Sequence, residues 1–320
     1  MYVMYYELGV NIMKKFIITV DSSCEVSKEI LDNLGIKMIY INYSDGQKVY
    51  SSNMNHEDYQ KFYENMEKGV VYKTSQINVQ EYYDFFEPLV KENNNILHIS
   101  LASGLSNTIN NVYIANEMLK EKYENVNIIP LDSKIASLGV YLIALQAYKL
   151  QQEDKDINEA FDLMSNFVKT VNTYFTTDNL TYFARGGRLN KVSAFIGNAL
   201  KINPVLDCLP NGQLRVVKRL RGRRKAIEYI IERMNNTLIE PENQTLFICH
   251  ANCETRANEL ATILMDRFHF KKIETYPMGP IIGAHAGPGL IALFYTGKTR
   301  SVEITNNLIN NEKYYQQFSK

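Results

Sequence analysis

The sequence contains few cysteines and no long apolar run. Its 320 residues include four cysteines, Cys24, Cys208, Cys249 and Cys253, whose spacing matches no disulfide framework. A chain of this length can bury enough apolar surface to fold without disulfides, so we interpret all four as reduced thiols of a cytoplasmic protein. The longest apolar stretch, residues 138–147, is about half of the ~18–20 residues that cross a bilayer, and we expect no transmembrane helix.

The sequence also lacks an excess of charge of either sign. It has 35 Lys and Arg residues and 35 Asp and Glu residues, so its formal net charge is zero. Proteins that coat nucleic acid or an anionic membrane are normally basic, and the charge balance argues against both functions. The hydrophobic content of 45% and the charged content of 22% are those of an ordinary globular protein. The length predicts two domains or one large domain.

Nucleotide-binding motifs and a targeting signal are absent as well. Neither GxxxxGK[ST] nor GxGxxG follows any apolar run that we interpret as a strand, so the sequence predicts no ATP or dinucleotide site. The first residues lack a basic start and contain Glu7, unlike a signal peptide. We therefore expect residues 1–12 to be an N-terminal extension without a chemical role, and Met13 to be the natural start.

Short apolar runs alternate with helical patterns over the first half of the chain. Strands are predicted over residues 16–20, 37–43, 95–100 and 126–131, and helices over residues 26–34, 110–123 and 138–151. Continuous apolar runs separated by helices are typical of parallel strands with crossover connections. We therefore predict an α/β/α layer domain with a mainly parallel sheet over residues 13–175.

The second half predicts a different α/β domain, over residues 176–320, with a mixed and partly antiparallel sheet. The dipeptide Asn211-Gly212 indicates a hairpin between strands at 204–209 and 213–220. Further strands are predicted at 245–251, 272–278 and 290–295, and helices at 193–200, 223–235 and 254–268. Because no low-complexity linker separates the halves, we expect the two domains to pack closely.

Polar clusters stand at the predicted carboxyl ends of strands, where open α/β sheets bind ligands. They are Asp21-Ser22-Ser23, Ser103-Gly104-Leu105-Ser106 and Asp132-Ser133, with Thr74-Ser75-Gln76 on a loop. Gly104 would let the backbone approach a ligand, and the helix start that follows suits an anion. The alternative is that these serines only cap helices and form turns.

The segment Gly279–Gly289, GPIIGAHAGPG, is predicted to be a glycine-rich loop with one histidine, His285. An imidazole there can donate a hydrogen bond to a carboxylate or act as a general base, or it can simply bind loop carbonyls. Cys249, His250 and Cys253 are too few for a closed zinc site, so we expect core thiols and no metal.

Residues 215–225, RVVKRLRGRRK, contain seven basic side chains and no acidic one. Such a patch can bind phosphate groups or an acidic partner. It can also be a solvated strand and helix start. The patch is the one feature that would support nucleic-acid binding, but it lacks interleaved aromatic residues.

Taken together, these segments resemble the DegV family of bacterial fatty-acid-binding proteins. Seven motifs occur in family order between Lys14 and Gly297: TVDSS at 19–23, KTSQ at 73–76, ISLASGLSNT at 99–108, DSKIASLG at 132–139, ARGGRL at 184–189, LRGRRKAI at 220–227 and GAHAGPG at 283–289. The chain departs from the usual pattern at Ile77-Asn78, at Asn203 and at Asn107, and none of these changes removes a proposed hydrogen-bond donor.

The resemblance implies that one long-chain fatty acid, such as palmitate, stearate or oleate, lies buried between two domains. Its carboxylate would be held by Thr74, Ser103 and His285, with support from Ser75, Gly104, Ser106 and Gly283. It also implies that Arg221, with its neighbours Arg219 and Arg223, serves phosphate transfer and docking to a separate fatty acid kinase.

On this interpretation the protein is a carrier, not an enzyme, and needs no cofactor besides the bound lipid. It would present the carboxylate for acyl phosphate formation, without nucleic acid and without an integral membrane segment, though with room for a transient membrane contact. The alternative from the residues is a Ser/His acyl-ester hydrolase that uses Ser103 as nucleophile and His285 as base, although Ser103 lies in no GxSxG motif.

Overall fold

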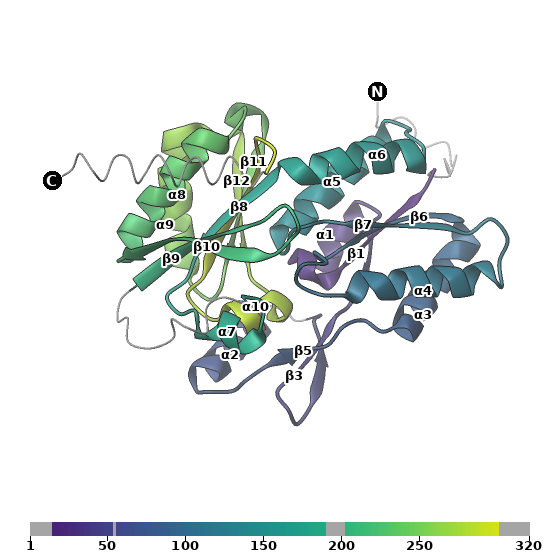
Figure 1. Cartoon of the computed structure of the whole chain (residues 1–320), viewed down its shortest axis with the longest axis horizontal. Helices are drawn as coiled ribbons and strands as arrows, with labels where there is room; N and C mark the ends of the chain where they lie inside the picture. Colours follow the sequence, from purple (N-terminus) through teal and green to yellow (C-terminus); the bar gives the residue numbers. More distant parts are fainter. Residues whose placement is uncertain (1–14, 54–55, 190–201, 301–320) are drawn as a thin grey trace.

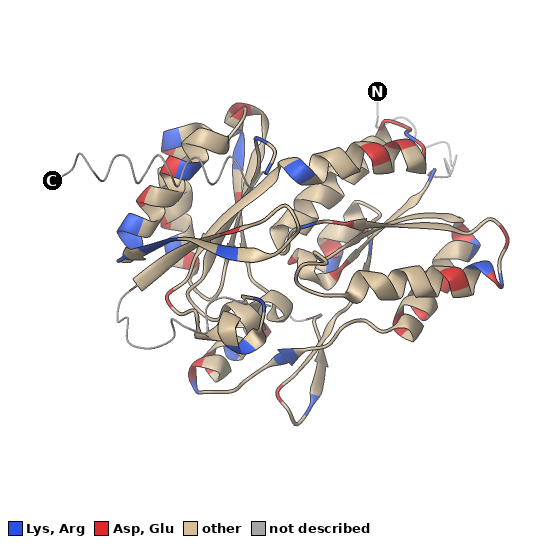
Figure 2. Cartoon of the chain, viewed as in Figure 1, with Lys and Arg blue, Asp and Glu red and all other residues tan. Residues whose placement is uncertain are grey.

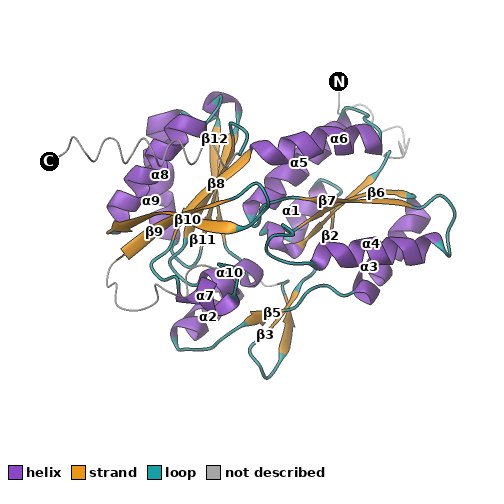
Figure 3. Cartoon of the chain, in the orientation of Figure 1, coloured by secondary structure: helices purple, strands orange, loops and turns teal. Residues whose placement is uncertain are grey.

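The structure is a computed structural model that describes residues 15–53, 56–189 and 202–300 (Figure 1). Over these residues the chain forms two α/β layers side by side, with a small third sheet below them (Figure 3). The predicted two-domain α/β fold, with one parallel and one mixed sheet, is confirmed. The expected extension at 1–12 and the helix predicted over 193–200 lie outside the described residues.

The first sheet is parallel and has the strand order β2-β1-β6-β7. Its strands are β1 (Ile17–Asp21), β2 (Lys37–Ile39), β6 (Asn95–Ser100) and β7 (Asn127–Asp132). All five residues of β1 are buried, as expected for a central strand covered on both faces. Five helices pack against this sheet: α1 (Lys28–Asn33), α3 (Val79–Glu92), α4 (Thr108–Lys120), α5 (Leu138–Gln152) and α6 (Ile157–Phe167).

The second sheet is mixed and has the order β10-β9-β8-β13-β11-β12. Its strands are β8 (Val171–Thr176), β9 (Ile202–Cys208), β10 (Leu214–Arg221), β11 (Thr245–His250), β12 (Lys272–Pro277) and β13 (Ile291–Thr296). Strands β9 and β10 form the predicted antiparallel hairpin, and β11 and β12 are parallel. Helices α8 (Arg223–Thr237) and α9 (Glu254–Phe268) lie together at the far left of the molecule in Figure 1. The predicted boundary after residue 175 falls within β8.

Helix α5 joins the two layers. Its sequence, LGVYLIALQAYKLQQ, is apolar on nearly every side, which is the pattern of a helix surrounded by protein. It packs against β1 and β6 of the first sheet and against β8, β11 and β13 of the second. One continuous cluster of buried apolar side chains therefore extends from Ile18 in β1 to Phe247 in β11.

The strand predicted over 37–43 is interrupted. Residues 37–39 form β2, and the chain then leaves for a separate antiparallel sheet of β3 (Asn42–Ser44), β4 (Val49–Ser51) and β5 (Lys73–Thr74). The backbone N–H of Ile41 donates to Ser22 Oγ at 2.9 Å, so a side chain replaces the strand partner at the break. Periodicity did not reveal this exchange, because Ile39, Ile41 and Tyr43 are all buried.

The segment predicted as a glycine-rich loop is instead partly helical. Residues Pro280–Ala286 form α10, which follows α2 (His56–Glu67) and α7 (Thr181–Gly186) in chain order and packs against both. Pro280 occupies the first turn, where its missing N–H costs nothing. Gly287, at φ 74°, ends the helix in a conformation that favours glycine. The loop prediction was wrong because the proline that starts the helix and the glycine that ends it enclose only seven residues.

Within the described ranges, no helix is both long enough and apolar enough to cross a membrane. The four cysteines are buried, and burial raises the thiol pKa of each, to about 11 for Cys208 and about 12 for Cys253.

His98 at the centre of β6 generates a stability prediction. Its ring is fully buried between Tyr82 and Phe86, bonds Thr19 Oγ1 at 2.8 Å, and has its pKa lowered to about 3 by desolvation. Below pH 6.5 the unfolded chain takes up a proton that the folded chain refuses, so the free energy of unfolding falls as pH falls towards 3.

We expect this histidine to remove about 2 kcal/mol of stability between pH 7.5 and pH 5. Urea denaturation at both pH values should show a loss that is smaller by about this amount in His98→Gln. The exposed His269 is the control, and His269→Asn should keep the full loss. An unchanged pH dependence in His98→Gln would contradict a neutral buried imidazole.

Candidate functional site

An apolar cavity lies between the two sheets. Its volume is about 90 Å³, counted as the space that the centre of a water molecule can occupy. The wall combines side chains of the first layer, such as Ile41, Leu101 and Ile135, with side chains of the second, such as Phe175 and Phe294. Both layers are therefore needed to form it.

Most polar side chains of the wall belong to four segments. They come from the end of β5 and the residues after it, the start of α4, the turn after α7 and the last turn of α10, and comprise Thr74, Ser75, Gln76, Ser106, Thr108, Arg188 and His285. Ser137 and Thr173 also line the cavity. Thr74 Oγ1 and His285 Nε2 are 2.8 Å apart and share a hydrogen bond, although 211 positions separate them in the chain. Two of the three residues predicted to hold a carboxylate are thus in direct contact.

His285 is held as a neutral imidazole. Burial, together with the nearby Arg188 guanidinium, lowers its pKa to about 4. Its Nδ1 is buried and has no hydrogen-bond partner among the described residues. Gly186 leaves room for the imidazole ring, because a Cβ on Gly186 would lie 2.2 Å from His285 Nδ1. The glycine of the ARGGRL motif therefore leaves the space that the histidine occupies.

Arg188 is a site residue that the sequence analysis did not single out. Among the described residues that line the cavity, it is the one permanently charged side chain. Its Nη1 donates to Gly186 O at 2.7 Å and its Nε to Leu105 O at 3.2 Å, so the guanidinium spans α7 and the turn before α4. Desolvation lowers its pKa. The sequence contained one signal for this residue, since Arg188 directly follows Gly187. In the structure Gly187 forms a turn with φ 70°.

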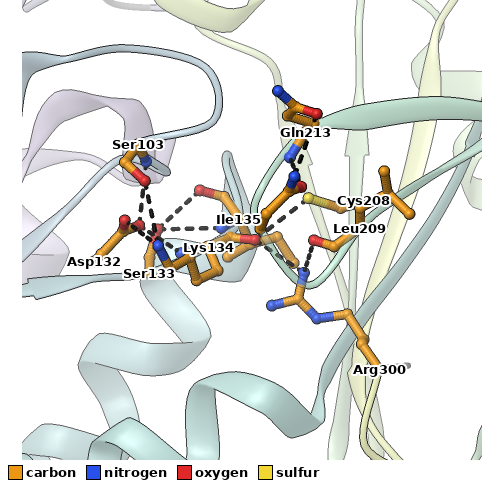
Figure 4. A network of polar contacts seen from close by, with 10 residues as sticks. Ser103, Asp132, Ser133, Lys134, Ile135, Cys208, Leu209, Gln213 and Arg300 are labelled. Atoms are coloured by element: carbon orange, nitrogen blue, oxygen red, sulfur yellow. Dashed lines mark hydrogen bonds and ion pairs between the residues drawn. The ribbon is translucent and has the colours of Figure 1, made fainter. Parts of the chain in front are cut away.

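Ser103 forms its hydrogen bonds with residues other than Thr74 and His285. Its Oγ accepts from Lys134 Nζ at 3.2 Å, and its backbone N–H donates to Asp132 Oδ1 at 3.1 Å (Figure 4). Lys134 also pairs with Asp132 at 2.6 Å. Among the described residues, Ser103 does not line the cavity, and it bonds Asp132 and Lys134 instead of His285.

The predicted supporting residues divide into two kinds. Ser75 and Ser106 line the cavity. Gly104 and Gly283 instead allow close packing. A Cβ on Gly104 would lie 2.6 Å from the backbone of Gly212 in the β9–β10 turn, and one on Gly283 would lie 2.4 Å from Tyr63 Oη.

The arginines predicted to meet a kinase lie outside the cavity. Strand β10 is the edge strand of its sheet, and Figure 2 shows the basic colour along it and at the start of α8. Arg219 and Arg221 are exposed two positions apart on this strand. Arg223, at the start of α8, pairs with Asp178.

Residues 249–253 form no metal centre in the structure. Cys249 and Cys253 are buried, and Cys253 N–H donates to His250 Nδ1 at 3.4 Å. Over the three described ranges, no group of three His, Cys, Asp or Glu side chains is arranged to hold a metal ion.

Comparisons with known proteins agree with this architecture. The DegV family model matches residues 15–298. A DegV domain-containing protein from Clostridium perfringens is 32% identical over 289 residues, which cover 90% of this chain and 99% of the relative.

Two solved structures share the fold at 27% sequence identity. A DegV lipid binding protein from Thermotoga maritima superposes with a TM-score of 0.77, covering 89% of this chain and 99% of that one. DegV from Bacillus subtilis, described as a fatty acid binding protein, gives a TM-score of 0.76 and covers 88% and 99%. Because the family match spans nearly all the described residues, the chain belongs to the DegV family.

Proposed function

We propose that this protein binds one long-chain fatty acid in the cavity between its two sheets. The observation that carries the proposal is the division of the cavity wall into an apolar part and a cluster of Thr74, Arg188 and His285. A fatty acid has the same division, with one charged end on an apolar chain. The fatty-acid-binding description of the Bacillus subtilis relative supports the same ligand class.

The carboxylate belongs at the polar end. Burying a carboxylate without partners is very costly, and a partnered one needs both hydrogen bonds and compensating charge. Thr74 offers a hydroxyl, the neutral His285 ring offers one N–H, and Arg188 offers the cation. The Thr74–His285 bond partners the Thr74 hydroxyl and His285 Nε2 before the ligand arrives, and one of these two groups turns to the carboxylate when it binds. Ser103 supports this end through the turn that it shares with Leu105 and Ser106.

The acyl chain supplies most of the affinity. At ~0.8 kcal/mol for each buried CH₂, fourteen methylenes contribute on the order of 11 kcal/mol before the cost of ordering the chain. The apolar wall from Ile41 to Phe294 provides the surface for this burial.

We further propose that the protein presents the carboxylate to a cytoplasmic fatty acid kinase and is not itself an enzyme. Exposed Arg219 and Arg221 on an edge strand suit an acidic or phosphate-bearing partner. The hairpin that carries them turns at Gly212, whose backbone lies against Gly104 next to the polar end. The docking strand and the binding site are therefore connected through one hairpin.

Native mass spectrometry of the freshly purified chain tests the ligand. We expect one adduct with the mass of a long-chain fatty acid, and solvent extraction should identify it. A ligand-free protein that also refuses added palmitate and oleate would contradict the proposal.

Removing a donor at the polar end should weaken binding while leaving the fold intact. For Arg188→Met and for His285→Ala we expect roughly a 10-fold or larger loss of oleate affinity, since a hydrogen bond to a charged group contributes about 1.5–3 kcal/mol. Displacement of a fluorescent fatty acid measures it. Arg185→Met is the matched control, because Arg185 is exposed and packs on Tyr182. Equal affinity in Arg188→Met and Arg185→Met would exclude Arg188 from the site.

For Arg221→Ala we expect near-normal fatty acid binding and strongly reduced phosphorylation of the bound lipid by a fatty acid kinase. The control is Arg224→Ala, whose side chain is exposed on the first turn of α8 and pairs with Glu228. Acyl phosphate formation is followed in a reaction with purified kinase. Loss of both binding and phosphorylation in Arg221→Ala would show that the residue is structural.

A further inference from the structure

A second, smaller cavity lies in the C-terminal layer. Residues of β8, the β9–β10 hairpin, α8 and the segment 298–300 line it. The centres of water molecules can occupy about 20 Å³ of it, by the measure used for the first cavity. The space therefore admits a water molecule or a small inorganic ion.

Positive charge dominates the lining. Four cationic side chains, Arg215, Arg233, Lys298 and Arg300, face one carboxylate, Asp207. Arg215 already engages both oxygens of Asp207, through Nε at 2.7 Å and Nη2 at 2.9 Å. Three cations therefore remain in excess of the acidic groups of the lining.

Arg233 is the most deeply buried of these cations, with 2% of its surface exposed. Its guanidinium lies 5.9 Å from the ring centroids of both Tyr174 and Tyr229. These cation–π contacts use the faces of the guanidinium, whereas its N–H groups point outward in its plane. Nε and Nη1 have no hydrogen-bond partner among the described residues.

Two further polar groups of the lining are also buried and have no hydrogen-bond partner in the described part of the chain. Arg300 donates through Nη1 to Lys134 O at 2.9 Å, the bond shown in Figure 4, and through Nη2 to Val168 O at 3.0 Å, but its Nε is unpaired. Thr173 Oγ1 is unpaired as well. The lining thus presents N–H and O–H donors together with an excess of positive charge.

We propose that this cavity binds one small inorganic anion, chloride in the cell, between the guanidinium groups of Arg233 and Arg300. Water could accept these hydrogen bonds but would leave the lining with an excess of positive charge, because Asp207, whose charge also acts on Arg233, is already paired with Arg215. The anion would link α8 to Arg300, which binds carbonyls of both layers, and so stabilise the wall that Thr173 and Cys208 share with the fatty acid cavity.

Thermal unfolding of the full chain tests the proposal in solution. At constant ionic strength, replacing gluconate by chloride up to 100 mM should raise the melting temperature by roughly 2 °C or more, because an anion that binds only the folded chain stabilises it. The shift should persist in Arg224→Gln, an exposed change on the same helix, and vanish in Arg233→Gln. A shift of equal size in all three proteins would show a general salt effect and overturn the proposal.

Bromide-soaked crystals of the unmodified chain give a test that does not depend on a variant folding. We expect an anomalous peak within hydrogen-bonding distance, about 3.3 Å, of Arg233 Nε or Nη1 and Arg300 Nε. Absence of that peak would overturn the proposal. A peak without any chloride-dependent stabilisation would mean binding at crystal concentration only, and would overturn it too.

Discussion

The structure depends on the burial of α5 between two sheets. A helix that is apolar on nearly all sides must be covered on all sides, and here strands of both sheets, α6 and the turn at residues 22–24 cover it together. The two layers consequently share one continuous core instead of meeting across a wet interface. The main cavity lies within this shared core, so its walls are packed like a protein interior and are mainly apolar, apart from the polar cluster and the side chains of Ser137 and Thr173.

The polar cluster provides partners for a charged group in this apolar interior. Thr74 and neutral His285 share a hydrogen bond, and Arg188 is held half-buried by carbonyls on α7 and on the turn before α4. The sequence led us to expect that hydroxyl and imidazole groups would suffice. The structure adds a cation, and the proximity of that cation helps to keep the imidazole neutral.

Two glycines allow close contacts between segments of the functional site. Gly186 gives the His285 ring its space, and Gly104 lets the turn after β6 touch the β9–β10 turn. The second contact brings the start of the basic strand next to the polar end of the cavity. A glycine at each of these points is required by space and not by turn conformation, since neither has a positive φ.

The sequence by itself determined the layered α/β fold, the β9–β10 hairpin and the helix at 254–268. Each of these rests on local signals: buried strand runs, an Asn-Gly turn and helical spacing. Local signals also indicated Thr74 and His285 as site residues. The same signals wrongly predicted a loop in place of α10 and one continuous strand in place of β2 and β3. Tertiary structure alone decided that Thr74 contacts His285, that Arg188 completes the cluster, and that Ser103 pairs with Lys134. These choices depend on contacts across up to 211 positions, and the geometry of such contacts is set by how α5 holds the two sheets, which no local pattern encodes.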